Sequence, residues 1–175
     1  MEHNIDAVPI YPVTNENCKH LVISMGSSSD NIENAIQDSP DHGLLKINLL
    51  RPINEQLFVD KIRSLKHLKT ITVLDRSRDY TSDNELYTTL NSILAKHDLS
   101  KSVRVLCGTY GLSGKDLSTR DIRAIYENAE TVQKSNFTVG IIDDIGNTNL
   151  TVSRASKVAP PNNKHVLALK FIGLG

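Results

Sequence analysis

Two glycine-bearing turns hold the residues whose types and spacing come nearest to a binding site. The first turn, Gly26 to Ser29, follows a short apolar run and precedes a helical pattern. Backbone N–H groups at a helix N-terminus are unpaired and attract anions, so Gly26, Ser27 and Ser28 are candidate contacts for a small anion. The turn has a single glycine, however, and lacks the spacing of a dinucleotide-binding or phosphate-binding loop. A structural turn that starts a helix is therefore favoured over a ligand site.

The second turn runs from Gly108 to Lys115 and contains two further glycines. Glycine permits left-handed backbone or the close approach of another segment. Lys115 could bind an anion. The glycines and the lysine would also suit a sharp strand-to-helix connection that packs against a partner domain, and we favour this second interpretation. The candidate residues of this turn, for an anion or for a neighbouring domain, are Tyr110, Gly111, Ser113 and Lys115.

Other combinations of reactive side chains give weaker support for chemistry. Asp75-Arg76 and Asp143-Asp144 follow two apolar runs, where carboxylates can bind Mg²⁺ or share a proton. No phosphate-binding loop accompanies them and acidic residues often end strands, so a structural role is favoured. Cys107 ends a buried run and suits an inert thiol better than a nucleophile. We therefore expect neither a catalytic residue nor a metal site in this chain.

The composition is that of an ordinary globular chain of 175 residues with no net charge. This neutral balance argues against a nucleic-acid-binding or membrane-surface protein. Cys18 and Cys107 stand alone, which excludes a disulfide framework or an all-cysteine metal site within the chain. They fit a reducing, intracellular compartment such as the cytoplasm or an anaerobic organelle. Neither a signal peptide nor an apolar run of transmembrane length is expected.

Apolar runs alternate with helical patterns along the chain. The expected strands are 20–25, 44–50, 70–74, 102–107 and 137–142, and the expected helices are 30–37, 54–65, 84–96 and 118–132. Asp30, Asp83 and Ser118 are suited to begin three of these helices. The alternation predicts a three-layer α/β fold, with a mainly parallel five-stranded sheet and helices on both faces. Right-handed crossovers then bring the turns after the strands to one edge of the sheet.

The regular pattern occupies residues 17–150, which we expect to form one domain. Residues 1–16 contain Pro9 and Pro12 without hydrophobic periodicity and are expected to be a linker or arm. Residues 151–175 form a tail with a last strand-like run at 165–172.

Six blocks of the sequence, in the same order, resemble the pyruvate:ferredoxin (2-oxoacid:acceptor) oxidoreductases. The blocks are Leu21–Ser27, Gly43–Ile47, Leu50–Pro52, Ile71–Arg76, Gly108–Lys115 and Phe137–Asp144. Together they are similar to the transketolase C-terminal-like domain, the second domain of those enzymes. Residues 11–17 resemble the connection from the preceding domain, and residues 169–175 resemble the start of the following one. The resemblance thus implies one piece of a multidomain enzyme.

This resemblance implies a limited role for the chain itself. The parent enzymes decarboxylate pyruvate oxidatively to acetyl-CoA, using thiamine diphosphate, Mg²⁺ and iron–sulfur clusters that other domains hold. The implied function is a structural interdomain module that is not catalytic alone. Its implied partners are other domains or subunits of the parent, through which it can also join a homo-oligomer. Thr109 and Gly114 replace an arginine and a serine that are usual in the family, which puts any contact of that arginine in doubt.

Other functions stay open on the sequence. A stand-alone module could bind a small anion or a nucleotide with the Gly26 and Gly108 turns. Fungal sulfite reductase subunits carry a decayed copy of the same domain, and the parent could be of that kind. A divergent interaction protein that has lost the parent's chemistry would show the same pattern. Binding of phosphates, coenzyme A or flavins would favour the stand-alone module.

Overall fold

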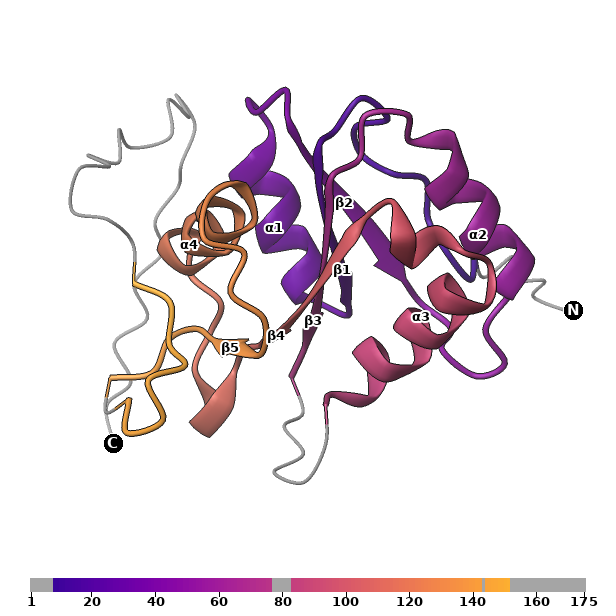
Figure 1. The fold of residues 1–175 in the computed structure, drawn as a ribbon. Coiled ribbons are helices and arrows are strands. Elements are labelled where there is room, and N and C mark those ends of the chain that lie inside the picture. Colours follow the sequence, from indigo (N-terminus) through magenta and orange to yellow (C-terminus); the bar gives the residue numbers. More distant parts are fainter. Residues whose placement is uncertain (1–7, 77–82, 143, 152–175) are drawn as a thin grey trace, which may run out of the picture.

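The sheet has five strands, all parallel, in the order β2-β1-β3-β4-β5 (Figure 1). The computed structural model describes residues 8–76, 83–142 and 144–151, apart from the side chain of Ser113. The strands are β1 (His20–Met25), β2 (His42–Ile47), β3 (Thr70–Asp75), β4 (Arg104–Thr109) and β5 (Phe137–Thr138). The helices are α1 (Ser28–Ile36), α2 (Glu55–Ser64), α3 (Glu85–Lys96) and α4 (Thr119–Glu130), with short 3-10 turns η1 (Leu99–Lys101) and η2 (Leu112–Gly114). The predicted α/β fold with a parallel five-stranded sheet is confirmed.

Helices cover both faces of the sheet, so the fold has three layers (Figure 1). Helices α2 and α3 share one hydrophobic core with residues of the central strands such as Ile23 and Val73. Helices α1 and α4 share a second core with the adjacent residues Val22 and Leu74. Side chains alternate between the two faces of a strand, which is why neighbouring residues enter different cores. Because both faces are covered, the central strands are apolar along most of their length.

A local side-chain contact explains where α4 begins, whereas α1 begins without a side-chain capping bond. Ser118 caps α4 by accepting from Asp121 N at 3.2 Å, and Asp121 Oδ2 accepts in return from Ser118 N at 3.1 Å, which forms a capping box. This start agrees with the prediction. Helix α1 begins at Ser28, two residues before the predicted Asp30. Asp30 instead lies exposed in the first turn, where it accepts from Lys46 Nζ at 2.9 Å.

Helix α3 begins differently from the way the sequence predicts. The N-cap position belongs to Asn84 rather than Asp83, and the Asn84 side chain makes no capping bond to the helix. It donates instead to Thr109 Oγ1 at 2.9 Å. The first turn of α3 donates from Leu86 N to Asp75 Oδ2 at 3.2 Å. The prediction of Asp83 as the cap is therefore wrong, because a carboxylate at the end of β3 accepts from this turn.

The last strand is much shorter than predicted. β5 covers Phe137–Thr138 instead of 137–142. Gly140 has a φ of 76° and turns the chain away from the sheet. Residues 148–150 then return beside the strand, where Thr138 N donates to Thr148 O at 3.0 Å. The second neighbour of β5 is therefore this returning segment.

The described part of the predicted arm lies along β2. Ile10 is 1% exposed and forms an antiparallel bridge with Ile47. Asn48 N donates to Pro9 O at 2.9 Å, so the chain after Ile47 pairs with the arm instead of extending β2 to residue 50 as predicted. A free strand edge favours association with other chains, and this segment covers it.

β4 covers Arg104–Thr109 rather than the predicted 102–107. The strand-like run at 165–172 lies outside the described residues. Within the described ranges, no helix combines the length and the hydropathy of a membrane span.

Candidate functional site at the carboxyl edge of the sheet

The carboxyl edge of the sheet contains a hollow of about 520 Å³ between the ends of β1 and β3. The chain passes from β1 to β2 on one side and then returns to β3 on the other, so the strand order reverses here. Ligands of open parallel sheets bind at this reversal point. Polar side chains and exposed backbone at the hollow come from Gly26, Ser27, Asn48, Asp75, Arg76, Glu85 and Tyr110. It therefore brings together members of both turns that the sequence singles out.

The turn after β1 presents its backbone to this hollow. Gly26 has a φ of 74°, a left-handed conformation that favours glycine, and no atom lies within 4 Å of the position that a Cβ would occupy. Ser27 is exposed, whereas Ser28 is buried as the first residue of α1. Gly26 and Ser27 are thus accessible, and Ser28 faces the interior.

A chain of buried hydroxyl groups joins the two turns. Ser28 Oγ lies 2.9 Å from Ser24 Oγ and 2.8 Å from Tyr110 OH, and it donates to Met25 O at 3.2 Å. A serine hydroxyl has one hydrogen, so Ser24 and Tyr110 must be the donors to Ser28. The donor hydrogens of all three hydroxyl groups are therefore used within the protein. Ser28 and Tyr110 hold the turns together instead of offering hydrogens to a ligand.

Arg76 supplies the positive charge at the hollow. Its side chain lies against Gly111, where an added Cβ would come 3.0 Å from Arg76 Nε. Gly111 also has a φ of 70°, so both the space and the backbone conformation favour glycine. Among the described residues that line the hollow, Arg76 alone is a cation, and it is exposed.

The rest of the second turn contacts other parts of the fold. Lys115 Nζ donates to Gly140 O at 2.9 Å, which ties the turn to the chain after β5. Gly108 lies within the sheet, where an added Cβ would be 2.5 Å from Phe137 Cζ. The side chain of Ser113 lies outside the described part of the chain. Lys115 is therefore not among the residues that line the hollow.

The acidic residues at the strand ends have partners within the fold. Asp75 accepts from the first turn of α3, as described above. Asp144 accepts from Thr148 N at 2.9 Å and from Asn149 N at 2.8 Å. Burial raises the pKa of Asp144, but the hydrogen bonds and a nearby lysine outweigh it and hold this pKa below its usual value. Asp143 lies outside the described residues. Asp75 and Asp144 thus shape their loops, in line with the structural interpretation.

Both thiols are buried. Burial raises the pKa of Cys107, and it raises the pKa of Cys18 to about 11 against a smaller opposing effect of a backbone hydrogen bond. Thiols with such pKa values stay protonated at neutral pH and are poor nucleophiles. Among the described residues, no group of three or more His, Cys, Asp and Glu side chains could hold a metal ion.

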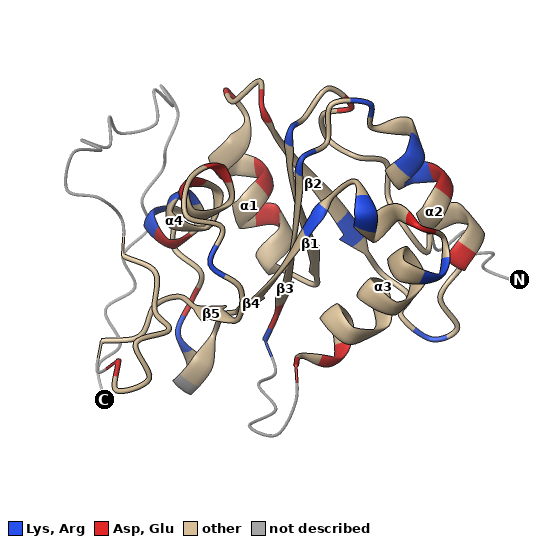
Figure 2. Cartoon of the chain, in the orientation of Figure 1, with Lys and Arg blue, Asp and Glu red and all other residues tan. Residues whose placement is uncertain are grey.

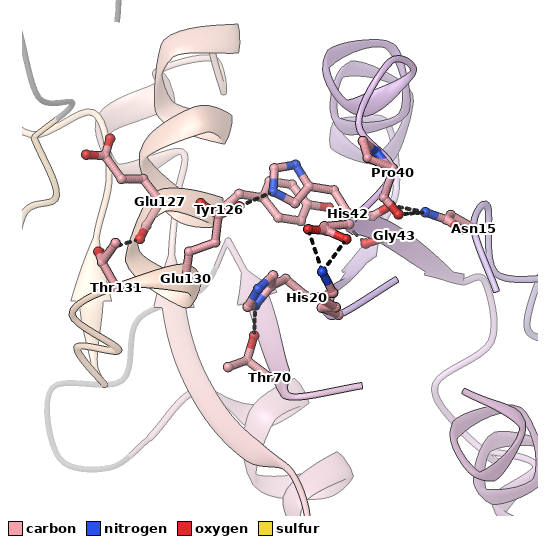
Figure 3. A network of polar contacts seen from close by, with 12 residues as sticks. Asn15, His20, Pro40, His42, Gly43, Thr70, Tyr126, Glu127, Glu130 and Thr131 are labelled. Atoms are coloured by element: carbon pink, nitrogen blue, oxygen red, sulfur yellow. Dashed lines mark hydrogen bonds and ion pairs between the residues drawn. The ribbon is translucent and has the colours of Figure 1, made fainter. Parts of the chain in front are cut away.

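A second polar group, at the amino edge of the sheet, joins α4 to β2 (Figure 3). His42 Nε2 lies 2.6 Å from Glu130 Oε1, and the His42 ring stacks on Tyr126 with 4.1 Å between ring centroids. Nearby, His20 Nδ1 lies 2.9 Å from Thr70 Oγ1. Sequence reasoning missed this group because its partners are far apart along the chain, 88 residues in the case of His42 and Glu130. Each of these residues stands alone in the sequence, without a local motif.

The carboxyl-edge hollow therefore supports binding better than covalent chemistry. It offers the Ser27 hydroxyl, the Arg76 guanidinium and exposed backbone at Gly26. No nucleophile with an adjacent base lines it among the described residues. The fold and this edge define a doubly wound, parallel α/β domain with a polar hollow at its strand-end turns.

The chain is similar to one part of several much longer enzymes named for pyruvate oxidation. It is 34% identical over 163 residues to a pyruvate:ferredoxin oxidoreductase of Moorella thermoacetica, which covers 90% of this chain and 13% of the relative. It is 28% identical over 166 residues to a pyruvate-flavodoxin oxidoreductase of Trichormus variabilis, with the same two coverages. A pyruvate dehydrogenase [NADP(+)] of Cryptosporidium parvum is 34% identical over 133 residues, which are 71% of this chain and 7% of that relative. No protein-family model matches the chain.

The chain is thus homologous to one segment of the pyruvate:ferredoxin and pyruvate-flavodoxin oxidoreductases, which confirms its resemblance to these enzymes. It spans about an eighth of the length of these relatives.

Proposed function

We propose that the chain is a structural interdomain module of a pyruvate:ferredoxin, or related 2-oxoacid, oxidoreductase. The observation that carries this proposal is the alignment of 90% of the chain with only 13% of a much longer enzyme. In this proposal residues 17–150 correspond to the transketolase C-terminal-like domain. Residues 1–16 are the linker into it, and residues 151–175 begin the next domain.

The carboxyl edge is the surface that we assign to a neighbouring domain. Beside the hollow, Leu49 is 45% exposed, and Val8 and Tyr11 of the arm are about as accessible. These residues lie close together because Leu49 N donates to Pro9 O at 3.2 Å. Exposed apolar groups that gather in one place are typical of interfaces. The accessible candidate residues Gly26 and Ser27 lie at the same edge and would join the contact.

The cofactors of the parent enzyme are assigned to its other segments. An iron–sulfur cluster needs several cysteine ligands. The chain has only two cysteines, Cys18 and Cys107, and both are buried, 89 positions apart in the sequence. The donor set of this chain does not fit such a cluster. We assign no reaction step on thiamine diphosphate or Mg²⁺ to this chain.

An assay of the isolated chain and of its mixture with the remaining parent polypeptide tests the proposal. We expect no decarboxylation of pyruvate and no binding of thiamine diphosphate by the chain alone. We expect it to restore activity to a parent polypeptide that lacks this segment. Appreciable turnover by the isolated chain would contradict the proposal.

A second candidate function is the binding of a small anion at the hollow. The observation that favours it is the meeting of Arg76, Ser27 and the Gly26 backbone at the strand-order reversal. Thermal-shift and calorimetric titrations with inorganic phosphate, coenzyme A and FMN provide the test. A rise in melting temperature with a ligand that is lost in Arg76→Gln and kept in Arg120→Gln would support this function. No thermal shift and no heat of binding with any of the three ligands would reject it.

A further inference from the structure

The amino edge of the sheet carries a basic cluster that the proposed function does not use. We call it the basic edge and define it as Lys19, Arg63, Lys66, Lys69, Lys101 and Arg104. Figure 2 shows blue segments gathered where β1, β3 and β4 begin and where α2 ends. Asp41 and Asp98 lie beside the cluster and pair with two of its members, so the other four residues supply its excess positive charge.

Backbone hydrogen bonds hold three of these residues side by side. Lys69 N donates to Lys19 O at 2.8 Å, and Arg104 N donates to Lys69 O at 3.0 Å. They lie at the start of three neighbouring strands, which are about 5 Å apart in a sheet. Lys66 lies in the turn just before Lys69, and this turn is anchored by Leu65 and Leu68, which pack against the core. The charges therefore share one surface.

Several of these cations have no acidic partner in the part of the chain that the structure describes. Lys19 and Lys101 form ion pairs with Asp41 at 2.9 Å and with Asp98 at 2.7 Å. The exposed residues with neither an ion pair nor a side-chain hydrogen bond to any described residue are Arg63, Lys66, Lys69 and Arg104. Burial lowers the pKa of His20, and the positive charge of the nearby Lys69 adds a smaller lowering effect.

Local stability does not account for the cluster. Arg63 lies in the last turn of α2, where a cation interacts favourably with the helix dipole. Lys69 and Arg104 come before or at the start of strands, where no such dipole exists. Adjacent like charges repel one another and lower the stability of the fold. A binding role explains why they gather here despite this repulsion.

We propose that the basic edge docks an acidic protein surface contributed by another segment of the larger enzyme. The inference rests on the proposed function, because most of the length of the relatives lies outside the part that this chain matches. Charge complementarity defines the partner's chemistry, a surface rich in Asp and Glu. Aromatic residues, which stack on nucleobases, make up only 5% of the chain, so a protein partner is favoured over a nucleic acid.

Binding of a fluorescent oligoglutamate peptide to the 175-residue chain tests this docking. The test variant is the triple Lys66→Gln, Lys69→Gln and Arg104→Gln. The control variant, Arg51→Gln, Arg120→Gln and Arg123→Gln, removes the same charge elsewhere. We expect the peptide to bind at low ionic strength, about tenfold more weakly to the test variant, and with less than about a twofold change in the control. The melting temperature of the test variant should be equal to or above that of the original chain.

Four outcomes would overturn the docking proposal. They are no binding of the peptide, equal loss in both variants, tighter binding of an oligonucleotide of equal charge, or a lower melting temperature of the test variant. The last outcome would assign these residues a structural role. Failure here leaves the restoration of parent activity by this chain untouched, whereas turnover by the isolated chain would reject the proposed function without changing peptide binding.

Discussion

Single residues at the carboxyl ends of the strands are constrained by what lies opposite them. An added Cβ at Gly108 would come 2.5 Å from Phe137 Cζ and 2.7 Å from Leu74 Cδ2, both in the closed core. We expect Gly108→Ala to lower the free energy of unfolding by about 1–3 kcal/mol, because a packed core resists extra atoms. Urea denaturation measures the change. Gly146→Ala is the control, since its Cβ would meet no atom closer than 3.7 Å. An equal loss in both variants would contradict the steric explanation.

The buried His20 should make stability depend on pH. Burial lowers its pKa, and the nearby His42 and Lys69 lower it further, against an opposing effect of Glu130 and Asp41. A base whose pKa is lower in the folded state binds fewer protons there than in the unfolded chain. Its contribution to stability is therefore complete above the unfolded value of about 6.5 and is lost as the pH falls below that value toward the folded pKa.

Unfolding measured at several pH values checks this expectation. We expect the free energy of unfolding to decrease between about pH 7.5 and about pH 5.5, and His20→Gln to flatten part of the decrease. The exposed His67 provides the matched control, His67→Gln, in which a different imidazole is removed. A steeper decrease in His20→Gln than in the original chain would show that the sign is wrong.

Among the elements, the sequence predicts those whose signals are local. The start of α4 is read correctly because Ser118 and Asp121 are three residues apart. The cap of α3 is misread because Asp75 lies 11 residues before Leu86, across a connection whose folding the sequence does not reveal. β5 is overextended because its apolar pattern continues past Gly140, where the backbone turns away. Contacts that depend on tertiary structure are the ones that local patterns cannot predict.

The covered edge of β2 makes the arm part of the fold's stability. Ile10 is 1% exposed and packs with the core that includes Ile47 and Phe58. We expect Ile10→Ala to cost about 2–4 kcal/mol, because it leaves a cavity and loosens the segment over the strand edge. Val8→Ala should have little effect, since Val8 is 42% exposed. Chemical denaturation with light scattering measures stability and edge association together. Equal stability of the two variants would mean that the arm does not hold the sheet.

At the scale of the whole molecule, the sequence predicts the sheet topology more completely than it predicts which side chains meet at each edge of the sheet. Parallel strands place Gly26 and Tyr110 at one edge, and the structure puts both at one hollow. Lys115 belongs to the same turn as Tyr110 but bonds to Gly140, because the chain after β5 comes back to it. The pair of His42 and Glu130 depends on α4 returning to the amino edge. Its position follows from packing, which no spacing in the sequence encodes.

The carboxyl edge provides the test of the molecule as an interdomain module. We expect Leu49→Asp to weaken association with the remaining parent polypeptide by about tenfold or more, because a charge would replace an apolar contact at the interface. Val132→Asp is the matched control, since Val132 is 76% exposed and lies after α4, away from the hollow. Analytical ultracentrifugation of the mixed chains measures association, and circular dichroism checks that both variants keep the fold. If both variants associate as the original chain does, the neighbouring domain does not contact the Leu49 surface, and the role of this edge would be reduced to the small-anion site at Arg76.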